Sequence, residues 1–428
     1  MRDKPSNLRR ACMSAHLTDK ITFYRQSSEK EGKNPMLHRQ QAHYALIQGL
    51  YWAVYCLMVG FASAYMLDVG FTNAQIGLVL GSSYLFSMVL QMVIGAWFSR
   101  HIRRLNQAVA CTYIPVVVLS LGVMLLPLGK GPLAAALAAM FTIQSMMQPS
   151  VNALHQSFEQ EGQPVNFGLA RGVGSAAYAL SSFAMGRVLV RFSPGILPAV
   201  YGVVTLALIL ALLTARTRPL IKAGTREDER GASYAGILKK QPTLILFLLG
   251  AGCMFLTYSF IDNFLLQILI SIGGNSASLG TAITLSAMTE LPAMLLFAHF
   301  GAKGRGLRIY LASIWFWLLK DILTFFAGST GMLYAVQLLN FFSCAIYVPG
   351  MMYYMRRMLP LVHLLRGVTL AGTVTTLGSL IATVLGGWLI DAAGVRTALG
   401  LVQIFAVSGT VMMTIALVYA DRYRPSDQ

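Results

Sequence analysis

Long apolar stretches alternate with short polar turns along almost the whole chain. A helix needs about 20 mainly apolar residues to cross a membrane, and twelve stretches reach roughly this length. The predicted spans are 43–66, 75–98, 107–128, 133–157, 168–190, 195–214, 242–270, 277–300, 309–327, 331–354, 366–390 and 396–420. The pattern therefore predicts an all-α membrane protein with twelve transmembrane helices.

Two longer polar segments interrupt this pattern. One precedes the first span, and the other divides the spans into six and six. The first has no apolar run, so it is not a cleavable signal peptide, and Met36 within it leaves open a later start of translation. The expected parts are a cytoplasmic polar tail (1–42), a six-helix bundle (43–214), a cytoplasmic linker (215–241), a second six-helix bundle (242–420) and a cytoplasmic C-terminal tail (421–428).

Composition and charge agree with a membrane location. The 428 residues are 56% hydrophobic and 11% charged, whereas soluble domains carry about 25% charged residues. The net charge is +17, and 27 of the 33 Lys and Arg residues fall in segments on the same side as the N-terminus. This asymmetry predicts a multi-pass protein of the cell membrane with both termini in the cytoplasm. It indicates contact with the anionic lipid bilayer rather than with nucleic acid.

Polar residues recur at helical spacing in three of the spans. The stripes are Gln144, Gln148, Asn152 and His155; Arg171, Ser175, Tyr178 and Ser182; and Gln337, Asn340, Ser343 and Tyr347. In the first span, Tyr51 and Tyr55 share a face with Gln48. We expect these faces to line a central wet cavity, although hydrogen bonds between helices are the alternative for any single residue.

Five charged residues lie deep in the predicted spans: Arg171, Asp262, Glu290, Lys320 and Asp321. A charge in this position costs about 2.5 kcal/mol or more and marks a functional hypothesis by default. All three acids belong to the second half of the chain. The sequence alone leaves a structural ion pair open as the alternative for Arg171, and an interhelical hydrogen bond as the alternative for Asp262.

Four stretches carry recognisable motifs. They are "NAQIGLVLGSSYLFSMVLQMVIGAWFSRHIRR" (73–104), "NFGLARGVGSAAYAL" (166–180), "YSFIDNF" (258–264) and "AMTELPAM" (287–294). Together they resemble the lactose-permease-like branch of the major facilitator superfamily, which includes proton symporters for oligosaccharides, nucleosides and phenylpropionate. Ser99 and Ile102 replace the Asp and Gly of the superfamily's usual loop after the second helix. The fifth span lacks the antiporter Gly-Pro pair, which disfavours drug efflux.

The resemblance also implies roles for individual residues. Arg171 matches an arginine that hydrogen-bonds the sugar, and Tyr178 matches the aromatic residue that stacks on it. The acid that pairs with this arginine in the permease is Asn152 here, so Arg171 is expected to pair with Glu290 across the cavity or to bind an anionic solute. Glu290 and Asp262 match acids of the proton pathway. The tenth-helix His and Glu of that pathway are Asn340 and Ser343 here, and Lys320 replaces an arginine of the ninth helix.

The sequence thus predicts a secondary active transporter that moves a small polar organic solute by alternating access, as a proton symporter. Candidate solutes are a sugar, a nucleoside or an aromatic carboxylate. The alternative is a proton-driven efflux antiporter for amphipathic compounds. An enzyme is not expected, nor a cofactor, nor a metal site, and we expect a monomer. The expected solute-binding residues are Arg171, Tyr178, Ser175, Asn152, Gln148, Tyr55 and Asn340. The expected proton-coupling residues are Glu290, Asp262, Lys320 and Asp321.

Overall fold

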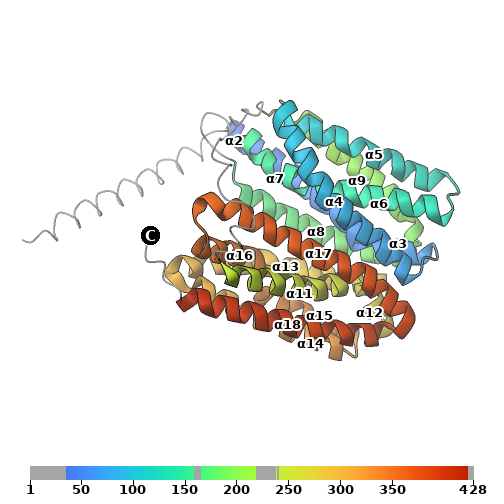
Figure 1. Cartoon of the computed structure of the whole chain (residues 1–428). Helices are drawn as coiled ribbons and strands as arrows, with labels where there is room; N and C mark the ends of the chain where they lie inside the picture. The colour runs from blue at the N-terminus through green and yellow to red at the C-terminus, as the bar shows by residue number, and fades with distance from the viewer. Residues whose placement is uncertain (1–34, 159–164, 218–237, 239–240, 423–428) are drawn as a thin grey trace, which may run out of the picture.

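The computed structural model describes residues 35–158, 165–217, 238 and 241–422. Within these ranges every regular element is a helix. Most of the expected N-terminal tail (1–34), most of the expected linker (218–237 and 239–240) and the last six residues (423–428) lie outside the described residues. The described helices form two bundles that lie side by side (Figure 1).

The first bundle holds the elements up to residue 214. They are α2 (Pro35–Tyr55), η1 (Cys56–Gly60), α3 (Ala62–Asp68), α4 (Asn73–His101), α5 (Leu105–Leu125), α6 (Lys130–Met146), α7 (Gln148–Ser157), α8 (Phe167–Arg191), η2 (Pro194–Ile196) and α9 (Leu197–Thr214). The second bundle begins at residue 242. Its elements are α11 (Pro242–Asn263), α12 (Leu265–Ser271), α13 (Ser276–Phe300), η4 (Gly301–Arg305), α14 (Gly306–Phe326), α15 (Thr330–Leu338), η5 (Leu339–Phe342), α16 (Cys344–Met358), α17 (Leu361–Ala393) and α18 (Val395–Arg422).

Eleven helices of the described chain are long and apolar enough to cross a membrane. The twelfth expected span, 133–157, is divided at Met147 into α6, with 17 residues, and α7, with 10 residues. Pro149 stands in the first turn of α7, where its missing N–H removes no hydrogen bond from that helix but disfavours a continuous one. Taken as one broken crossing, α6 and α7 complete the twelve, and the prediction of an all-α membrane protein is confirmed.

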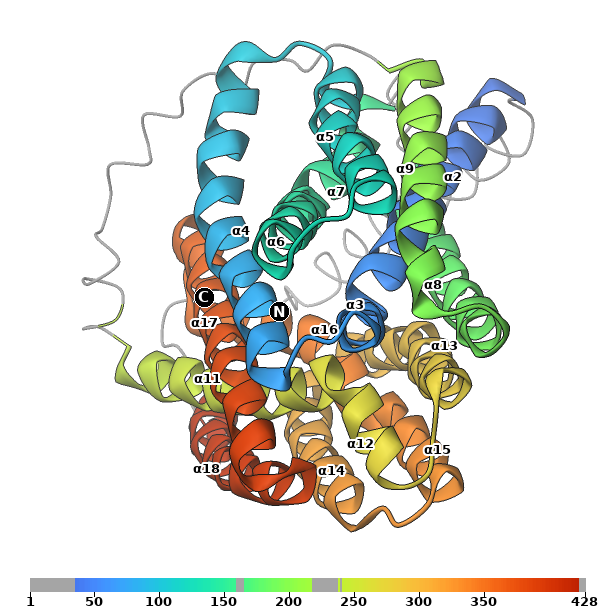
Figure 2. The same ribbon diagram turned by 90° about the vertical axis from the view of Figure 1, so that its right-hand side faces the viewer.

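Each bundle contacts the other through two of its long helices. α4 packs on α17 and α8 packs on α13, as the end-on view in Figure 2 shows. Gly186 and Gly280 let α8 and α13 approach closely, because a β-carbon on Gly186 would lie 2.9 Å from the Gly280 α-carbon. Gly77 of α4 meets the Thr383 carbonyl oxygen of α17 in the same way. Small residues at such crossings allow close backbone packing in place of large side chains.

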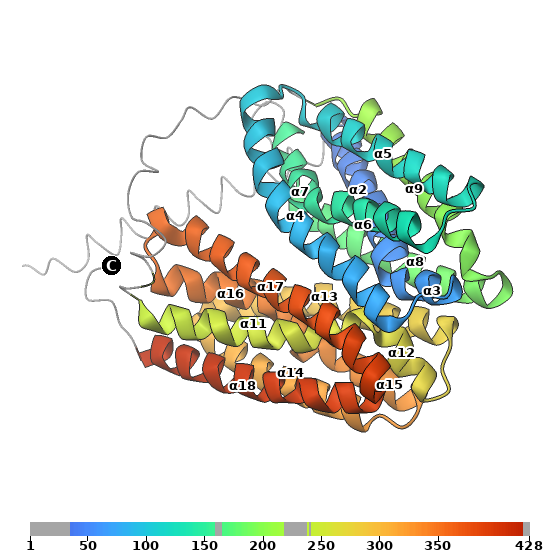
Figure 3. The ribbon, with the colours of Figure 1, turned by 45° about the vertical axis from the view of Figure 1, so that its right-hand side comes forward.

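These close approaches lie toward one end of the molecule. We call the end with the start of α2 and the end of α18 the terminal face, and the opposite end the distal face. The tight glycine contacts belong to the distal halves of their helices, and Figure 3 shows the two bundles converging there and diverging toward the terminal face. Ser182 Oγ also donates a hydrogen bond to the Gly280 carbonyl oxygen at 2.9 Å in this region.

Hydrogen bonds to one carboxylate join the two bundles at the distal face, and we call this contact the distal seal. Asp391, near the end of α17, accepts hydrogen bonds from the backbone N–H of Asn73 at 3.1 Å and of Ala74 at 2.7 Å, and from Asn73 Nδ2 at 2.8 Å. The first N–H groups of a helix have no partner within that helix and attract negative charge. Asp391 of the second bundle therefore caps α4 of the first.

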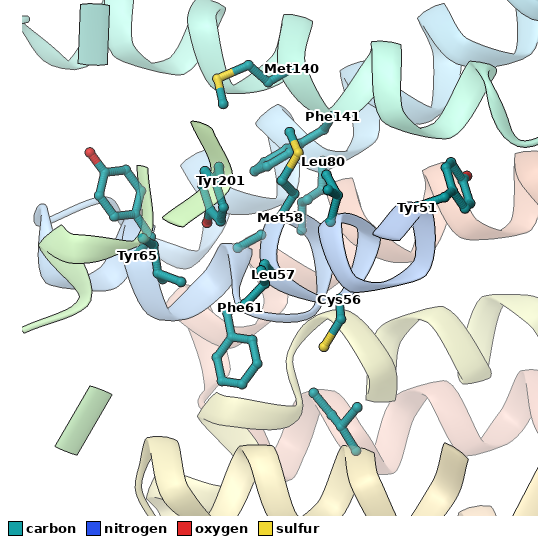
Figure 4. Packing of buried hydrophobic residues seen from close by; sticks show 14 of the residues in the cluster. Tyr51, Cys56, Leu57, Met58, Phe61, Tyr65, Leu80, Met140, Phe141 and Tyr201 are labelled. Atoms are coloured by element: carbon teal, nitrogen blue, oxygen red, sulfur yellow. The ribbon is translucent and has the colours of Figure 1, made fainter. Parts of the chain in front are cut away.

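The buried apolar core follows the same division. One cluster runs from the first bundle into the distal part of the second, where it includes Phe260, Phe264 and Leu279. Figure 4 shows its centre around η1, with Leu57, Met58 and neighbouring side chains packed between helices. A second cluster occupies only the terminal part of the second bundle. The bundles thus share a continuous core at the distal face.

Candidate functional site

A cavity of about 400 Å³ lies between the two bundles. The first bundle contributes to its wall from α2, α4, α7 and α8, and the second contributes from α11, α12, α13, α14, α15 and α17. Both polar and aromatic side chains line it. A concave site at the interface of two halves, with a few convergent polar groups, is the usual place for a small-molecule ligand.

Arg171 is the centre of the contacts in this cavity. Its guanidinium lies 3.9 Å from the centre of the Trp52 ring, and Nη1 donates a hydrogen bond to Ser175 Oγ at 2.8 Å. Across the cavity, Nη2 lies 4.0 Å from Glu290 Oε2. The Arg171 side chain retains 25% of its exposure and the Glu290 side chain 36%, so both groups remain accessible from the cavity. The contacts with Trp52 and Ser175 hold the guanidinium in place on its own bundle, and its other N–H donors point to the accessible side, where a ligand can reach them.

Aromatic rings surround this arginine. Trp52 packs edge-on against Tyr178 at 6.3 Å between ring centres and lies 5.4 Å from Tyr55. On the opposite wall, Phe255 and Tyr258 line the same cavity. Aromatic faces with hydroxyl groups at their edges suit a solute that has both a flat apolar surface and polar substituents.

The remaining charges all belong to the second bundle. Asp262 is exposed to the cavity, whereas Lys320 and Asp321 of α14 are 6% and 2% exposed. Lys320 Nζ donates a weak hydrogen bond to Asn340 Oδ1 at 3.4 Å. Asp321 Oδ2 is buried without a hydrogen-bond partner among the described residues. A buried polar atom without a partner is rare in folded proteins.

Nine of the eleven predicted site residues line the cavity, and two do not. Those in the wall are Arg171, Tyr178, Ser175, Gln148, Tyr55, Glu290, Asp262, Lys320 and Asp321. Asn152 instead accepts hydrogen bonds from Gln48 Nε2 and, through its carbonyl oxygen, from the Tyr44 hydroxyl. Asn340 is buried behind the wall, where it contacts Lys320 and donates to the Ser286 carbonyl oxygen.

The three polar stripes face the cavity only in part. Helix breaks explain the difference in two of them, because α6 ends before Gln148 and η5 interrupts the tenth span at 339–342. Gln144, which precedes the first break, is buried and donates to the Tyr51 carbonyl oxygen. Tyr51 itself, expected at the cavity, is fully buried and donates to the Gln144 carbonyl oxygen at 3.2 Å. These residues hold helices together.

Trp52 and Tyr84 are wall residues that sequence reasoning missed. A signal existed for Trp52, because it lies three residues before Tyr55 and therefore shares a helix face with it. The family resemblance assigned no binding residue to the first span, so this spacing alone did not identify Trp52 as a residue of the cavity wall. Tyr84 carried no such signal, and only the packing of α4 against the second bundle brings it near Asn263, 3.4 Å from its hydroxyl.

Two six-helix bundles around one polar cavity define a membrane transporter of the major facilitator type. The chain belongs to the MFS_1 like family, whose model matches residues 43–400. It is 21% identical over 393 residues to a Bacillus subtilis (strain 168) protein named as the uncharacterized transporter YwbF, and the match covers 89% of this chain and 94% of that protein.

Solved structures share the fold. A single-substitution mutant of the nucleoside transporter NupG has a TM-score of 0.76 at 13% identity and covers 89% of this chain and 99% of its own. A POT family peptide transporter in an auto-inhibited state has a TM-score of 0.70 at 12% identity, covering 91% and 98%. A bacterial homologue of the human lysosomal transporter Spinster, inward-facing and unoccupied, has a TM-score of 0.66 at 14% identity, covering 92% and 100%. At these identities the likeness concerns the fold.

Proposed function

We propose that the chain is a secondary active transporter that carries a small polar organic solute across the cytoplasmic membrane as a proton symporter. The solute is a sugar, a nucleoside or an aromatic carboxylate. The chain catalyses no chemical reaction and works as a monomer by alternating access, with both termini in the cytoplasm.

One observation carries this proposal: Arg171 of the first bundle and Glu290 of the second meet at 4.0 Å inside the cavity. A solute that binds between them contacts both bundles at once, so its affinity depends on how the bundles are arranged. Differential affinity for two arrangements is what lets a ligand drive a conformational change. The aromatic wall around Arg171 favours solutes with a ring, and the nucleoside transporter NupG has the same fold.

The acids of the second bundle support the proposal of proton coupling. Asp262, Glu290 and Asp321 all line the cavity, and Asp321 has one oxygen without a hydrogen-bond partner among the described residues. A carboxyl group away from bulk water loses its charge readily, and a neutral Glu290 no longer attracts Arg171. Proton binding and solute binding are thereby linked through one guanidinium.

The first test is a thermal-shift screen of the purified chain against sugars, nucleosides and aromatic carboxylates. We expect one class to stabilise the protein, and we expect Arg171→Gln to abolish that shift. Arg187→Gln is the matched control, because Arg187 lies on the same helix and stacks on Phe183 at 3.3 Å, but it is exposed and does not line the cavity. Weak shifts by many amphipathic compounds that persist in Arg171→Gln contradict the proposal and favour efflux.

The second test measures uptake of that solute into liposomes. A proton gradient is expected to drive accumulation by the parent chain, while Glu290→Gln and Asp262→Asn exchange solute without accumulating it. If uptake by the parent chain does not depend on pH and is unchanged in both variants, proton coupling is refuted and the chain is a facilitated-diffusion carrier.

A further inference from the structure

A second hollow lies on the outside of the first bundle, away from the central cavity. It has a volume of about 710 Å³ and is formed by the end of α4, the start of α5 and the turn between them. The wall includes Trp97 on α4, Arg103 and Arg104 in the turn, and Cys111 on α5. None of these residues belongs to the proposed solute site. We call this hollow the α4–α5 groove.

The position of the α4–α5 groove relative to a membrane follows from its helices. The apolar spans end at Phe98 in α4 and begin at Leu105 in α5, so the turn lies at the membrane surface on the terminal face. From there the groove continues along α5 to Ala108, Cys111 and Thr112, within the apolar span. Its polarity therefore changes from charged at the surface to apolar toward the membrane interior.

The charged side chains at the membrane-surface end of the groove are all basic. His101, Arg103, Arg104 and Gln107 lie there, and no carboxylate occurs among the described residues that line the groove. Arg103 and Arg104 are exposed, and neither forms an ion pair or a hydrogen bond with another side chain in the described part of the chain. Two guanidinium groups without a counter-charge present about ten N–H donors to a single anion or its neighbours.

Trp97 lies between the basic end and the apolar end of the α4–α5 groove. The residue is 51% exposed, and its ring stacks with the His101 ring at 5.5 Å between centres. Tryptophan prefers the depth at which headgroups meet acyl chains. We propose that the α4–α5 groove is a binding site for an anionic phospholipid, with the phosphate on Arg103 and Arg104 and an acyl chain along Ala108, Cys111 and Thr112.

This site differs from the general attraction between a basic face and an anionic membrane. The corresponding turn of the second bundle, 301–306, also carries two exposed basic residues, Lys303 and Arg305. Lys303 Nζ is already hydrogen-bonded to His299 Nε2 at 3.0 Å. Removing two positive charges there changes the net charge as much as removing them from the groove, so this turn provides the matched control.

Quenching of Trp97 fluorescence by brominated phospholipid tests the proposal on the full chain in detergent. The difference between the parent and Trp97→Phe isolates the Trp97 signal. We expect dibrominated phosphatidylglycerol to quench this signal at lower concentration than dibrominated phosphatidylcholine. At about 1 kcal/mol for each basic residue, Arg103→Gln with Arg104→Gln raises the half-quenching concentration of phosphatidylglycerol about 30-fold. Lys303→Gln with Arg305→Gln leaves it within about threefold.

Two results overturn the proposal. Equal quenching by the two lipids in the parent chain means that Trp97 contacts acyl chains without a headgroup site, and this comparison requires no substituted arginine. An equal loss of phosphatidylglycerol preference in the control pair means diffuse attraction to the basic face. The uptake assay is separate, so failure of the lipid site leaves the proposed transport function untouched.

Discussion

Arg171 shows how one residue connects the two bundles at the smallest scale. Its charge is stacked on Trp52, hydrogen-bonded to Ser175 and opposed by Glu290. The first two partners belong to its own bundle and fix its position. The third belongs to the other bundle and, in the proposed function, takes up the coupling proton. Under the proposed function, this partly exposed arginine responds to the protonation state of a carboxylate whose Oε2 lies 4.0 Å from its Nη2.

Trp52 is expected to act as a positioning residue for this guanidinium. A partly desolvated cation–π contact contributes about 0.5–2 kcal/mol, so Trp52→Ala is expected to weaken solute binding roughly 2- to 30-fold. Trp52→Phe keeps a ring and should lose less. Binding is measured by titration calorimetry, with Trp388→Ala as control because Trp388 is 60% exposed and outside the cavity. Equal losses in Trp52→Ala and Trp388→Ala contradict this role.

The Arg171–Glu290 pair predicts how pH affects the binding of an anionic solute. Ionised Glu290 competes with a carboxylate solute for Arg171, so the affinity of such a solute is expected to rise as the pH falls and Glu290 takes up a proton. Glu290→Gln should give the low-pH affinity at every pH. The pair is partly exposed, and solvent screening limits the expected effect to about tenfold.

Equilibrium binding measured between about pH 5 and pH 9 tests whether the affinity of the anionic solute rises as the pH falls. For a neutral sugar or nucleoside the same variant is expected to leave affinity nearly independent of pH. A carboxylate solute that binds Glu290→Gln more weakly than the parent at high pH would show that Glu290 contacts the solute directly.

At the scale of elements, helix ends and helix breaks decide which residues meet. The break between α6 and α7 turns Gln148 to the cavity and leaves Gln144 in the core. The π-helical η1 follows Tyr55 directly and carries α2 into α3. The distal seal also depends on a helix end, because Asp391 caps the first turn of α4.

Asp391→Ala is expected to loosen the distal seal. Loss of a helix cap costs about 0.5–2 kcal/mol, which shifts the balance between the distally closed and distally open arrangements by roughly 2- to 30-fold. A single cysteine at Thr376 in the cavity should then react faster with an impermeant maleimide added at the distal side. Asp68→Ala is the control, because Asp68 is an exposed carboxylate at the same face. An unchanged labelling rate would show that the glycine crossings alone close this end.

At the scale of the whole molecule, the position of the buried apolar core shows at which face the two bundles are closed. Apolar packing is continuous between the bundles at the distal face and separate at the terminal face. With the termini in the cytoplasm, as proposed, this is the arrangement that faces inward. Alternating access requires the reverse arrangement as well, in which α4 and α8 lose their distal contacts with α17 and α13.

Two label pairs measure this rearrangement after the five native cysteines are replaced by serine. Gly129→Cys with Gly328→Cys spans the bundles at the distal face, where a β-carbon at either position would have no neighbour within 4 Å. Thr214→Cys with Arg305→Cys spans them at the terminal face. On adding solute and protons we expect the distal distance to lengthen and the terminal distance to shorten in spin-label measurements. Distances that change in the same direction at both faces contradict rocking of the bundles.

The sequence by itself determined the helices, because the length and apolarity of each span are local properties that lipid demands of any crossing segment. It also located the deep charges, since their cost in a membrane makes them conspicuous in an apolar run. Arg171, Glu290, Asp262, Lys320 and Asp321 all line the cavity as expected.

Only the tertiary structure decided which polar residues face the cavity and which bind neighbouring helices. Helical spacing shows which residues share a face of one helix, but not what that face packs against. The sequence therefore could not distinguish Gln148 and Gln337, which line the cavity, from Gln144, Asn152 and Asn340, which bind neighbouring helices. Breaks at Met147 and at η5 rotate the following residues away from the ideal stripe. The stack of Trp52 on Arg171 and the cap of Asp391 on α4 join residues 119 and 318 positions apart. Contacts over such separations depend on how helices pack, which no local pattern encodes.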